Sequence, residues 1–446
     1  MSKGRVLLIS HWFPPAGGIA VQRALSLAKY LPQYGCEVHV LAPTNPPSPV
    51  LDPSLLAQVP ASVTIHRAWT PSPPSQLRKR MWGFFSGGTA KSTKATQPNN
   101  NGSSHVSNLI RRVLCPDPEV VWFPFAFRRA SQIVKKHGID TVLVTAPPFS
   151  AFLIGNALKR KFPHLRLISD FRDEWLRFFL STFDFQKSQY IRGHAEAIER
   201  ATIELSDIVV SITPPIVSEL RERYPTQPES KFVCIPNGYD PASFANFCAR
   251  SHETSKILVT YVGTVYSTTS PRLYLEALDA LGESVRMRIE TLFVGRIAED
   301  QRNFLESRPD VKLLGYVTQK EALHRMEETD YLLLVMNDPT FATGKIYEYL
   351  ATGKPILALS PTGGEVERTL QETGGGWCID PNDGQAIRAA LKKVACNDLA
   401  SQFRPNQDAI RGYERPRLAE KFAQIILGDG RSPSARSECA AVTHAH

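Results

Sequence analysis

Short, almost unbroken apolar runs alternate along the chain with segments whose apolar positions recur at helical spacing. Runs without polar alternation are typical of parallel strands buried on both faces. The pattern therefore predicts an α/β fold with two doubly wound, Rossmann-like domains. In the first half, strands are predicted at Arg5–Ser10, Glu37–Leu41, Thr141–Ala146, Leu165–Phe171, Ile208–Ile212 and Lys231–Pro236, and helices at Ile19–Leu31, 150–161, 190–205 and 214–223. In the second half, strands are predicted at Ile257–Gly263, Arg288–Gly295, Val311–Val317, Tyr331–Met336, Pro355–Leu359 and Gly376–Ile379.

The domain limits follow from turn signals and composition. The string IPNGYDPASF carries Pro, Asn-Gly and Asp-Pro turn signals and gives way to a polar run, which predicts a linker between the domains. Residues 86–108 are low in complexity and predict a disordered insertion. We expect a first domain over 1–236, a linker over 237–256, a second domain over 257–403, a final helix within 404–427 and a mobile tail over 428–446.

The stretch from Tyr331 to Ser360 predicts a strand, a loop, a helix and a second strand. Thr340 or Thr343 can cap the start of the helix, and Gly353 can take the left-handed conformation at its end. A helix that opens from a small-residue loop at the carboxyl end of a parallel strand has free N–H groups and a positive dipole end. Such a helix can bind an anion.

The first turns of this helix carry candidate residues for binding a nucleotide. Gly344 and Lys345 open the helix, and Glu348 follows three residues later on the same face. Here a cation can meet a phosphate while a carboxylate accepts ribose hydroxyls, which suits a nucleotide diphosphate. Alternatively, Lys345 and Glu348 form an exposed ion pair that contributes a few tenths of a kcal/mol to helix stability.

The loop HWFPPAGG follows the first predicted strand. Gly17 and Gly18 let the backbone approach an anion at the start of the next helix. The loop does not follow the G-x-G-x-x-G pattern, so the fingerprint of dinucleotide binding is missing. The alternative is a tight structural turn that needs no ligand.

The string ISDFRDEW ends a parallel strand with two acids and an arginine, at the edge of the sheet where ligands bind. Asp170 and Asp173 can orient an acceptor hydroxyl while Arg172 faces a departing phosphate, and these three are the candidate catalytic residues. Alternatively, they form a structural network that closes the strand end.

The net charge of +9 is concentrated in one segment. Residues 70–136 hold eleven Lys and Arg against two acids, and within them RKRMWGFF at 78–85 mixes cations with large apolar side chains. This combination favours an anionic membrane surface. Nucleic acid is a competing partner, although no recognition motif accompanies the cations, and a solvated basic loop is the structural alternative.

The seven scattered cysteines form no disulfide framework, and no apolar stretch reaches the roughly 20 residues needed to span a bilayer. We therefore expect a cytoplasmic protein, peripheral to the membrane if the basic segment binds lipid. No D-x-D string and no His, Cys or acid cluster with metal-ligand spacing occurs, so the sequence predicts no metal and no cofactor.

The segment FATGKIYEYLATGKPILAL resembles the donor-binding segment of glycosyltransferase family 4, whose members have two facing Rossmann-like domains in the GT-B arrangement. Members carry two glutamates here, eight positions apart. Glu348 matches the second, which holds the donor ribose, whereas Thr340 stands where the first is expected. The resemblance further implies that the final helix crosses back onto the first domain.

Other segments also resemble this family. Gly263 and Thr264 stand where members bind the diphosphate, but the two cations that follow in the family are missing, which leaves more of that role to Lys345. Tyr316 and Val317 resemble the loop that pairs with the donor base; the alternative is an ordinary strand end. P-P-x-G-G, I-P-N-G-x-D, PDPEVVWFPFA and D-x-R-D-x-W are similar to family segments, the last two to a subgroup that builds bacterial surface polysaccharides.

The resemblance implies a retaining, metal-independent glycosyltransferase that moves a sugar from a nucleotide-diphosphate sugar to a glycan or polyprenyl-linked acceptor. Two alternatives remain open, a sugar-nucleotide 2-epimerase and a catalytically silent GT-B-like protein that binds nucleotide sugar or glycan. The sequence specifies neither the base, the sugar nor the linkage.

Overall fold

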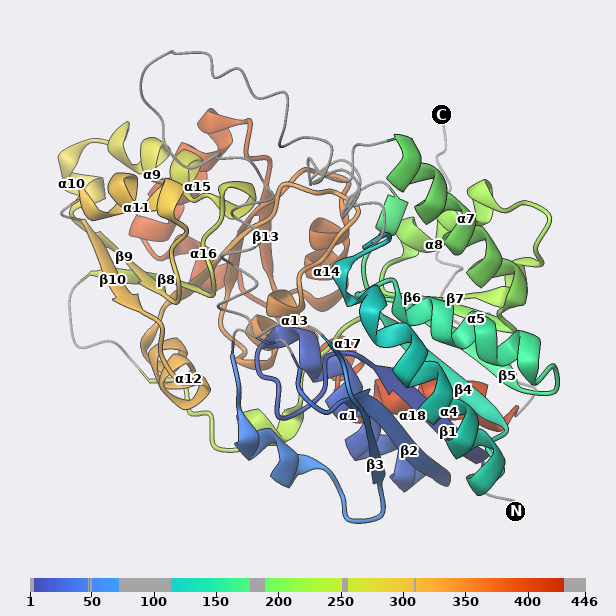
Figure 1. Cartoon of the computed structure of the whole chain (residues 1–446). Coiled ribbons are helices and arrows are strands. Elements are labelled where there is room, and N and C mark those ends of the chain that lie inside the picture. The colour runs from blue at the N-terminus through green and yellow to red at the C-terminus, as the bar shows by residue number, and fades with distance from the viewer. Residues whose placement is uncertain are drawn as a thin grey trace, which may run out of the picture. The chain divides into compact units, whose positions relative to one another are not determined.

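The computed structural model describes residues 4–46, 48, 50–71, 114–176, 189–250, 256–308 and 310–428. The chain divides into two compact units. The first unit comprises Met1–Ile235 together with Ala419–His446, and the second comprises Pro236–Leu418. Each unit is an α/β layer structure built on one parallel sheet (Figure 1).

The first unit contains a seven-stranded sheet in the order β3-β2-β1-β4-β5-β6-β7. All neighbouring strands are parallel. The order reverses between β1 and β4, and the carboxyl ends at such a switch point are where doubly wound sheets bind ligands. The strands are β1 (Gly4–Ser10), β2 (Cys36–Pro43), β3 (Thr64–Ala68), β4 (Thr141–Ala146), β5 (Arg166–Phe171), β6 (Ile208–Ser211) and β7 (Phe232–Cys234).

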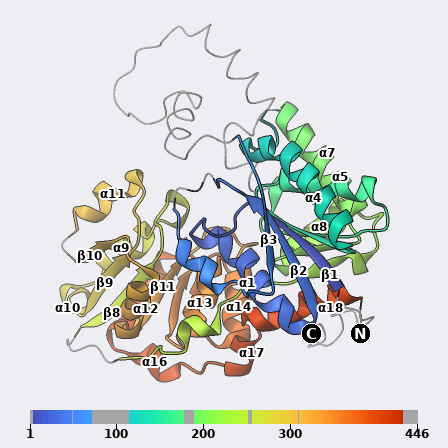
Figure 2. The same cartoon turned by 60° about the horizontal axis from the view of Figure 1, so that its bottom comes forward.

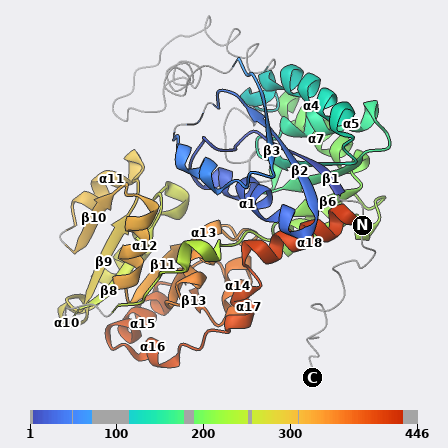
Figure 3. The ribbon, with the colours of Figure 1, turned by 90° about the horizontal axis from the view of Figure 1, so that it is seen from below.

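Helices cover both faces of the first sheet. The helices α4, α5 and α7 pack side by side on one face, whereas α1 lies on the other face together with the last helix, α18 (Figure 3). The helices are α1 (Gln22–Tyr30), α4 (Phe123–His137), α5 (Ala151–Lys161), α7 (Gln189–Leu205), α8 (Pro214–Arg223) and α18 (Arg415–Leu427).

The second unit contains a six-stranded parallel sheet in the order β10-β9-β8-β11-β12-β13. The first four strands of this order are labelled in Figure 2. Here the order reverses between β8 and β11. The strands are β8 (Ile257–Val262), β9 (Ile289–Val294), β10 (Val311–Gly315), β11 (Tyr331–Val335), β12 (Ile356–Leu359) and β13 (Gly376–Ile379).

Alternating side chains of the central strands build two cores in the second unit. Leu333 and Leu357 belong to the core under α9 and α15, whereas Leu332 and Ile356 belong to the core under α13 and α14. Strands buried in this way on both faces explain the unbroken apolar runs in the sequence. The helices are α9 (Arg272–Asp279), α10 (Glu283–Arg286), α11 (Glu299–Glu306), α12 (Gln319–Glu328), α13 (Gly344–Ala351), α14 (Glu365–Thr373), α15 (Gly384–Ala395), α16 (Asp398–Gln402) and α17 (Gln407–Arg411).

The predicted α/β fold with two doubly wound sheets is confirmed, and one strand and one α-helix of the first unit were missed. The edge strand β3 has the sequence TIHRA, which is too short and too polar to be distinguished from a loop. The helix α4 begins with Phe123 and Pro124 after a 3-10 turn, and proline is tolerated in a first helical turn because its missing N–H would have no partner there. The chain enters the last helix from the second unit, and from Ala419 onward this helix belongs to the first unit.

Among the described residues, no helix combines the length and the apolar character that a membrane crossing requires. The basic string at 78–85 and the low-complexity segment 86–108 lie outside the described residues.

Candidate functional site

The donor-site candidates gather at the switch point of the second sheet, where β8 and β11 are neighbours. Helix α13 follows β11 after a short loop. The Thr343 side chain caps the helix by accepting a hydrogen bond from the Lys345 backbone N–H at 3.5 Å. Gly353, with φ 66°, takes the left-handed conformation just beyond its end, as predicted. The amino-terminal end of α13 therefore lies at the carboxyl edge of the sheet, where its dipole favours an anion.

The Lys345 side chain lies across Gly263, the residue that follows β8. A Cβ atom added to Gly263 would lie 2.7 Å from Lys345 Nζ, closer than such atoms approach, and the φ of 131° also favours glycine. The Lys345 ammonium lies 4.0 Å from the centroid of the Tyr261 ring, on β8. Glycine at 263 thus leaves room for the cation to reach the strand end.

The backbones of three neighbouring strands approach closely beside this lysine. The Gly263 N–H donates to the Val294 carbonyl at 2.7 Å, and the Gly295 N–H donates to the Gly315 carbonyl at 2.7 Å. A Cβ atom on Gly295 would lie 2.2 Å from the Gly263 carbonyl oxygen. Only glycine fits at position 295, so no side chain of this residue covers the backbone at the carboxyl edge of the sheet.

Tyr349 fastens α13 to the end of β8. Its buried hydroxyl accepts a hydrogen bond from the Val262 N–H at 2.8 Å and lies 3.3 Å from the Val262 carbonyl. Burial holds the pKa of the Tyr349 hydroxyl well above its usual value, so it stays a neutral donor. This contact fixes the position of α13 relative to Val262, the residue before Gly263. It therefore also fixes the backbone from which the Lys345 side chain extends.

Glu348 lies one turn into α13 and is half-buried. Burial raises the pKa of its carboxyl, and the charges of Arg415 and Lys345 oppose that rise. Between the described residues Lys345 and Glu348 no ion pair forms, so the arrangement differs from the surface pair of the alternative interpretation. A half-buried carboxylate that is not held by its neighbour can accept hydrogen bonds from a ligand.

Tyr316 and Val317 follow β10 at the same edge of the sheet. Tyr316 is 65% exposed, and the Arg296 guanidinium lies 4.8 Å from its ring centroid. The Arg296 carbonyl accepts from the Val265 N–H at 2.9 Å, so Arg296 borders the loop that holds Gly263 and Thr264. Sequence analysis missed this cation because it follows β9, whereas the expected cations follow β8.

The loop between β11 and α13 contains Thr340, where the resemblance implies a glutamate. The Thr340 N–H and hydroxyl both donate to the Asp338 carboxylate, at 2.8 and 2.7 Å. A pocket of about 300 Å³ adjoins this loop, with Val335 and Asn337 in its lining. The second unit therefore offers a hollow at the carboxyl ends of β11 and β12.

In the first unit, Gly17 and Gly18 lie in the loop after β1. The Gly17 N–H donates to the Val50 carbonyl at 2.9 Å, which is a turn contact and leaves this group unavailable to an anion. Gly18 is exposed, with φ 87°, and directly precedes the 3-10 turn that leads into α1. Of the two glycines, Gly18 is therefore the one whose backbone is open to a ligand.

Asp170 is completely buried at the end of β5. Arg23 donates to both carboxylate oxygens, from Nη2 at 2.8 Å and from Nε at 2.9 Å, and the Thr145 hydroxyl donates to one of them at 2.7 Å. This is the geometry of the structural alternative, in which the acid closes the strand end. A catalytic role for Asp170 stays a prediction.

Arg172 is buried as well, and its guanidinium donates to the backbone carbonyls of Ala20, Ala146 and Pro147. It thereby joins the loop before α1 to the end of β4. Burial lowers the pKa of Arg172, and the carboxylates of Asp173 and Asp170 oppose that change.

Asp173 has a different environment from Asp170. It is half-buried, and none of the described residues donates a hydrogen bond to its carboxylate. Burial raises the pKa of Asp173 and the positive charge of Arg172 counteracts the rise. Of the three residues predicted from ISDFRDEW, Asp173 has the carboxylate most available to a substrate hydroxyl.

Arg23 was missed by sequence analysis. It lies on α1 among the buried residues Ala24, Leu25 and Leu27, and an arginine on an apolar helix face favours a buried acid as its partner. That signal was present in the string VQRALSLA, but it did not identify the partner, because Asp170 is 147 residues away.

In the described part of the second unit, no group of His, Cys and acid side chains has the geometry of a metal site. One such group lies in the first unit, formed by His39, His66 and His137.

Two family descriptions match the chain. Residues 16–243 match Glycosyltransferase Family 4, and residues 256–397 match Glycosyl transferases group 1. The probable glycosyltransferase WbjE of Pseudomonas aeruginosa is 33% identical over 120 residues, which are 26% of this chain and 30% of that protein. The match thus spans about a third of this relative.

Solved structures with the same fold include WaaG, a glycosyltransferase involved in lipopolysaccharide biosynthesis. Its TM-score is 0.60 at 17% identity, over 95% of this chain and 100% of WaaG. Anabaena HepE in complex with UDP has a TM-score of 0.55 at 12% identity, over 95% of this chain and 99% of HepE. At these identities the likeness shows the fold alone, which is the GT-B fold. Because the first family description alone covers more than half of the 446 residues, the chain belongs to glycosyltransferase family 4.

Proposed function

We propose that this protein is a retaining glycosyltransferase that moves a sugar from a nucleotide-diphosphate sugar to a hydroxyl group of a glycan or polyprenyl-linked acceptor. The observation that carries the proposal is the Lys345 ammonium, which lies across Gly263 at the amino-terminal end of α13. A cation and a helix dipole directed at the same strand edge suit a diphosphate leaving group.

The chemistry follows from where charge develops. When the bond between the sugar and the diphosphate breaks, negative charge builds on the diphosphate oxygens, and Lys345 stabilises it there. Arg296 supplies a second cation at the neighbouring strand end, and its stacking on Tyr316 gives a base a flat surface to approach. Glu348 accepts hydrogen bonds from the ribose hydroxyls. These charges serve the role that a divalent ion has in other transferases, so we propose a metal-independent reaction.

The substrate class is supported by the relatives. HepE was solved with UDP, which supports a nucleotide-diphosphate donor. WaaG is involved in lipopolysaccharide biosynthesis, which supports a role in the synthesis of a cell-surface polysaccharide. Retention rests on the family resemblance, and the acceptor hydroxyl would attack the face that the diphosphate leaves.

On the acceptor side, we assign the orienting carboxylate to Asp173 rather than to Asp170. The Asp170 oxygens are occupied by Arg23 and Thr145, whereas no described donor binds Asp173.

Membrane association through residues 70–136 is a further part of this proposal. Trp69 and Phe125, which are 53% and 41% exposed, lie edge to face at 4.9 Å within or directly beside that segment.

The test is incubation with a panel of radiolabelled nucleotide sugars, with products separated by chromatography. Hydrolysis or transfer supports the proposal. Interconversion of two nucleotide sugars would instead identify a 2-epimerase, and binding without turnover would identify a silent binding protein. Lys345→Ala should abolish most of the turnover, and Lys320→Ala, which removes an exposed lysine of α12, is the matched control.

A further inference from the structure

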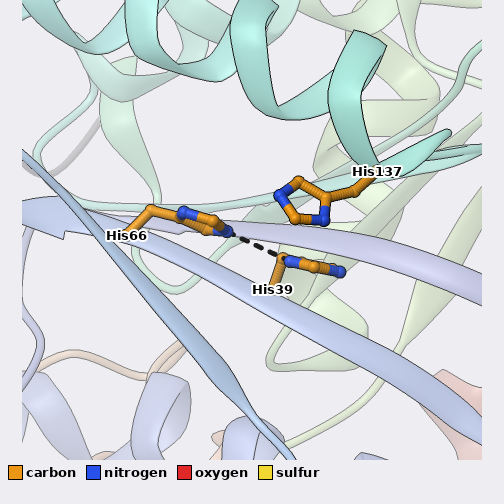
Figure 4. A group of neighbouring side chains, drawn as sticks. All are labelled: His39, His66 and His137. Atoms are coloured by element: carbon orange, nitrogen blue, oxygen red, sulfur yellow. Dashed lines mark hydrogen bonds between the residues drawn. The ribbon is translucent and has the colours of Figure 1, made fainter.

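Three histidines from separate parts of the sequence converge in the first unit (Figure 4). His39 lies on β2, His66 lies on β3, and His137 is the last residue of α4. One nitrogen from each lies within 4.8 Å of the corresponding nitrogens of the other two. No part of the proposed transferase chemistry uses these residues.

The backbone dictates that these rings share one face of the sheet. His39 is paired with Thr64 and Leu41 is paired with His66, so the two histidines are offset by two residues on adjacent parallel strands. Side chains two residues apart in a strand point to the same face. Helix α4 packs on that face and brings the His137 ring over the other two.

The inner nitrogens are already close to the spacing of metal ligands. His39 Nδ1 lies 3.1 Å from His66 Nε2. Two imidazole ligands of a tetrahedral zinc ion, each about 2.0 to 2.1 Å from the metal, lie roughly 3.3 Å from one another. A modest rotation of the His137 side chain would bring a third nitrogen to the same distance from such a metal.

Glu37 orients the first of these ligands. The outer nitrogen of His39, Nε2, lies 3.2 Å from the Glu37 carboxylate. A histidine that donates its outer N–H to a carboxylate presents the lone pair of its other nitrogen, which is the arrangement found behind metal-bound histidines. In His39 that other nitrogen is Nδ1, and it faces His66.

The surroundings of His66 and His137 favour the uncharged form of these two rings, which is the form that binds a metal. Burial lowers the pKa of His66 to about 4, and the proximity of His39 and His137 adds to that effect. Burial, again reinforced by His39, also lowers the pKa of His137. The nearby cations Arg129 and Lys136 act in the same direction on both rings, so protons compete weakly for these nitrogens at neutral pH.

We propose that His39, His66 and His137 bind a divalent transition metal, with zinc as the best match to three imidazoles. A water molecule would fill the fourth position. The His66 proton now shared with His39 Nδ1 would move to the other nitrogen of the His66 ring, so binding needs no net release of protons.

The role of the metal would be structural. His137 ends α4, which runs back toward the amino-terminal ends of the strands, whereas ligands of doubly wound sheets bind at the carboxyl ends. The site would join the edge strand β3, which precedes residues 72–113, to the helix that follows them. A cross-link across such a long connection removes much of the conformational freedom of the unfolded chain.

The experiment is a zinc titration of the metal-stripped full-length chain, followed by calorimetry. His444 and His446 are replaced by alanine throughout, since two histidines near the end of the chain can also bind metal. We expect one equivalent of zinc to bind and to raise the melting temperature. His137→Ala should weaken binding at least tenfold, and Glu37→Gln should weaken it 10- to 100-fold.

His164→Ala, which removes an exposed histidine of the same unit, is the control and should leave binding unchanged. Cobalt gives a second readout, because a site of low symmetry produces visible absorption bands, which His137→Ala should abolish. Glu37→Gln leaves all three rings in place, so it tests the site even if a histidine variant folds poorly. The proposal is overturned if zinc does not saturate at one equivalent, or if His137→Ala and Glu37→Gln bind it as the parent does.

Discussion

Lys345 and Glu348 lie on one helix, but replacing each of them should change the kinetics of the enzyme in a different way. Lys345 faces charge that grows as the sugar bond breaks, so Lys345→Ala should lower kcat, by about 100-fold, more than it changes KM. Hydrogen bonds from Glu348 to ribose are equally good before and during the reaction, so Glu348→Gln should chiefly raise the donor KM. Steady-state kinetics with Lys320→Ala as control distinguishes the two. If both variants lost only a few tenths of a kcal/mol of stability and no turnover, the donor site would be misassigned.

A second prediction concerns Asp117, whose carboxylate accepts hydrogen bonds from the Ser150 N–H and hydroxyl at 2.9 and 2.6 Å. Burial, reinforced by the charge of Glu119, raises the pKa of Asp117 to about 7, whereas an unfolded aspartate titrates near 4. Between these values the folded protein binds more protons than the unfolded chain. Its free energy of unfolding should therefore fall as pH rises from about 4 to 7, by on the order of 1 kcal/mol per pH unit, and level off above 7.

Urea unfolding of the parent and of Asp117→Asn across this pH range measures the effect. Asparagine keeps an oxygen acceptor for Ser150 but does not titrate, so the difference between the two proteins should change with pH. A constant difference would show that Asp117 is ionised throughout.

At the scale of elements, the Arg23–Asp170 ion pair connects α1 to the end of β5 inside the first unit. Asp170→Asn leaves Arg23 buried without its counter-charge and should cost about 3 to 5 kcal/mol of stability. Asp173→Asn should leave stability nearly unchanged and lower transfer by roughly 100-fold, if this carboxylate orients the acceptor. Urea unfolding together with kinetics checks both. The reverse result, a stable but inactive Asp170→Asn variant, would restore the catalytic role predicted for Asp170 from the sequence.

Elements defined by nearby residues could be predicted, and those defined by distant contacts could not. The limits of α13 follow from Thr343 and Gly353, which lie within or beside the helix. β3 exists because β2 pairs with it, and nothing within its five residues indicates a strand. The same holds for three features of the sites: the pairing of Arg23 with Asp170, the position of Arg296 after β9, and the histidine group. Each depends on residues that only the folded sheets bring together. The sequence thus indicated that Gly263 lies at a strand end and Lys345 at the start of a helix, but it did not identify the distant charges that fold against such positions.

At the scale of the whole molecule, the charge asymmetry predicts salt-dependent binding to membranes. Residues 70–136 carry the entire net charge, and each cation near an anionic surface contributes on the order of 1 kcal/mol at low salt. Cosedimentation with anionic vesicles should therefore fall with ionic strength and with the combined variant Arg78→Gln, Lys79→Gln and Arg80→Gln. The control replaces Lys320, Lys392 and Lys393 by glutamine. Equal pelleting with neutral vesicles would contradict a role for this segment in lipid binding.

The last helix has a consequence for how the chain is made. The first unit includes Ala419 onward, and Phe422 and Leu427 lie against Arg23 and Gly4, near the opposite end of the sequence. On the ribosome, domains generally fold in the order in which they emerge. The first sheet is synthesised early and α1 covers part of this face, but the part that α18 covers stays open until the second unit has been translated as well. A nascent chain stalled within α14 or α15 would therefore display an apolar surface that α18 conceals in the folded protein.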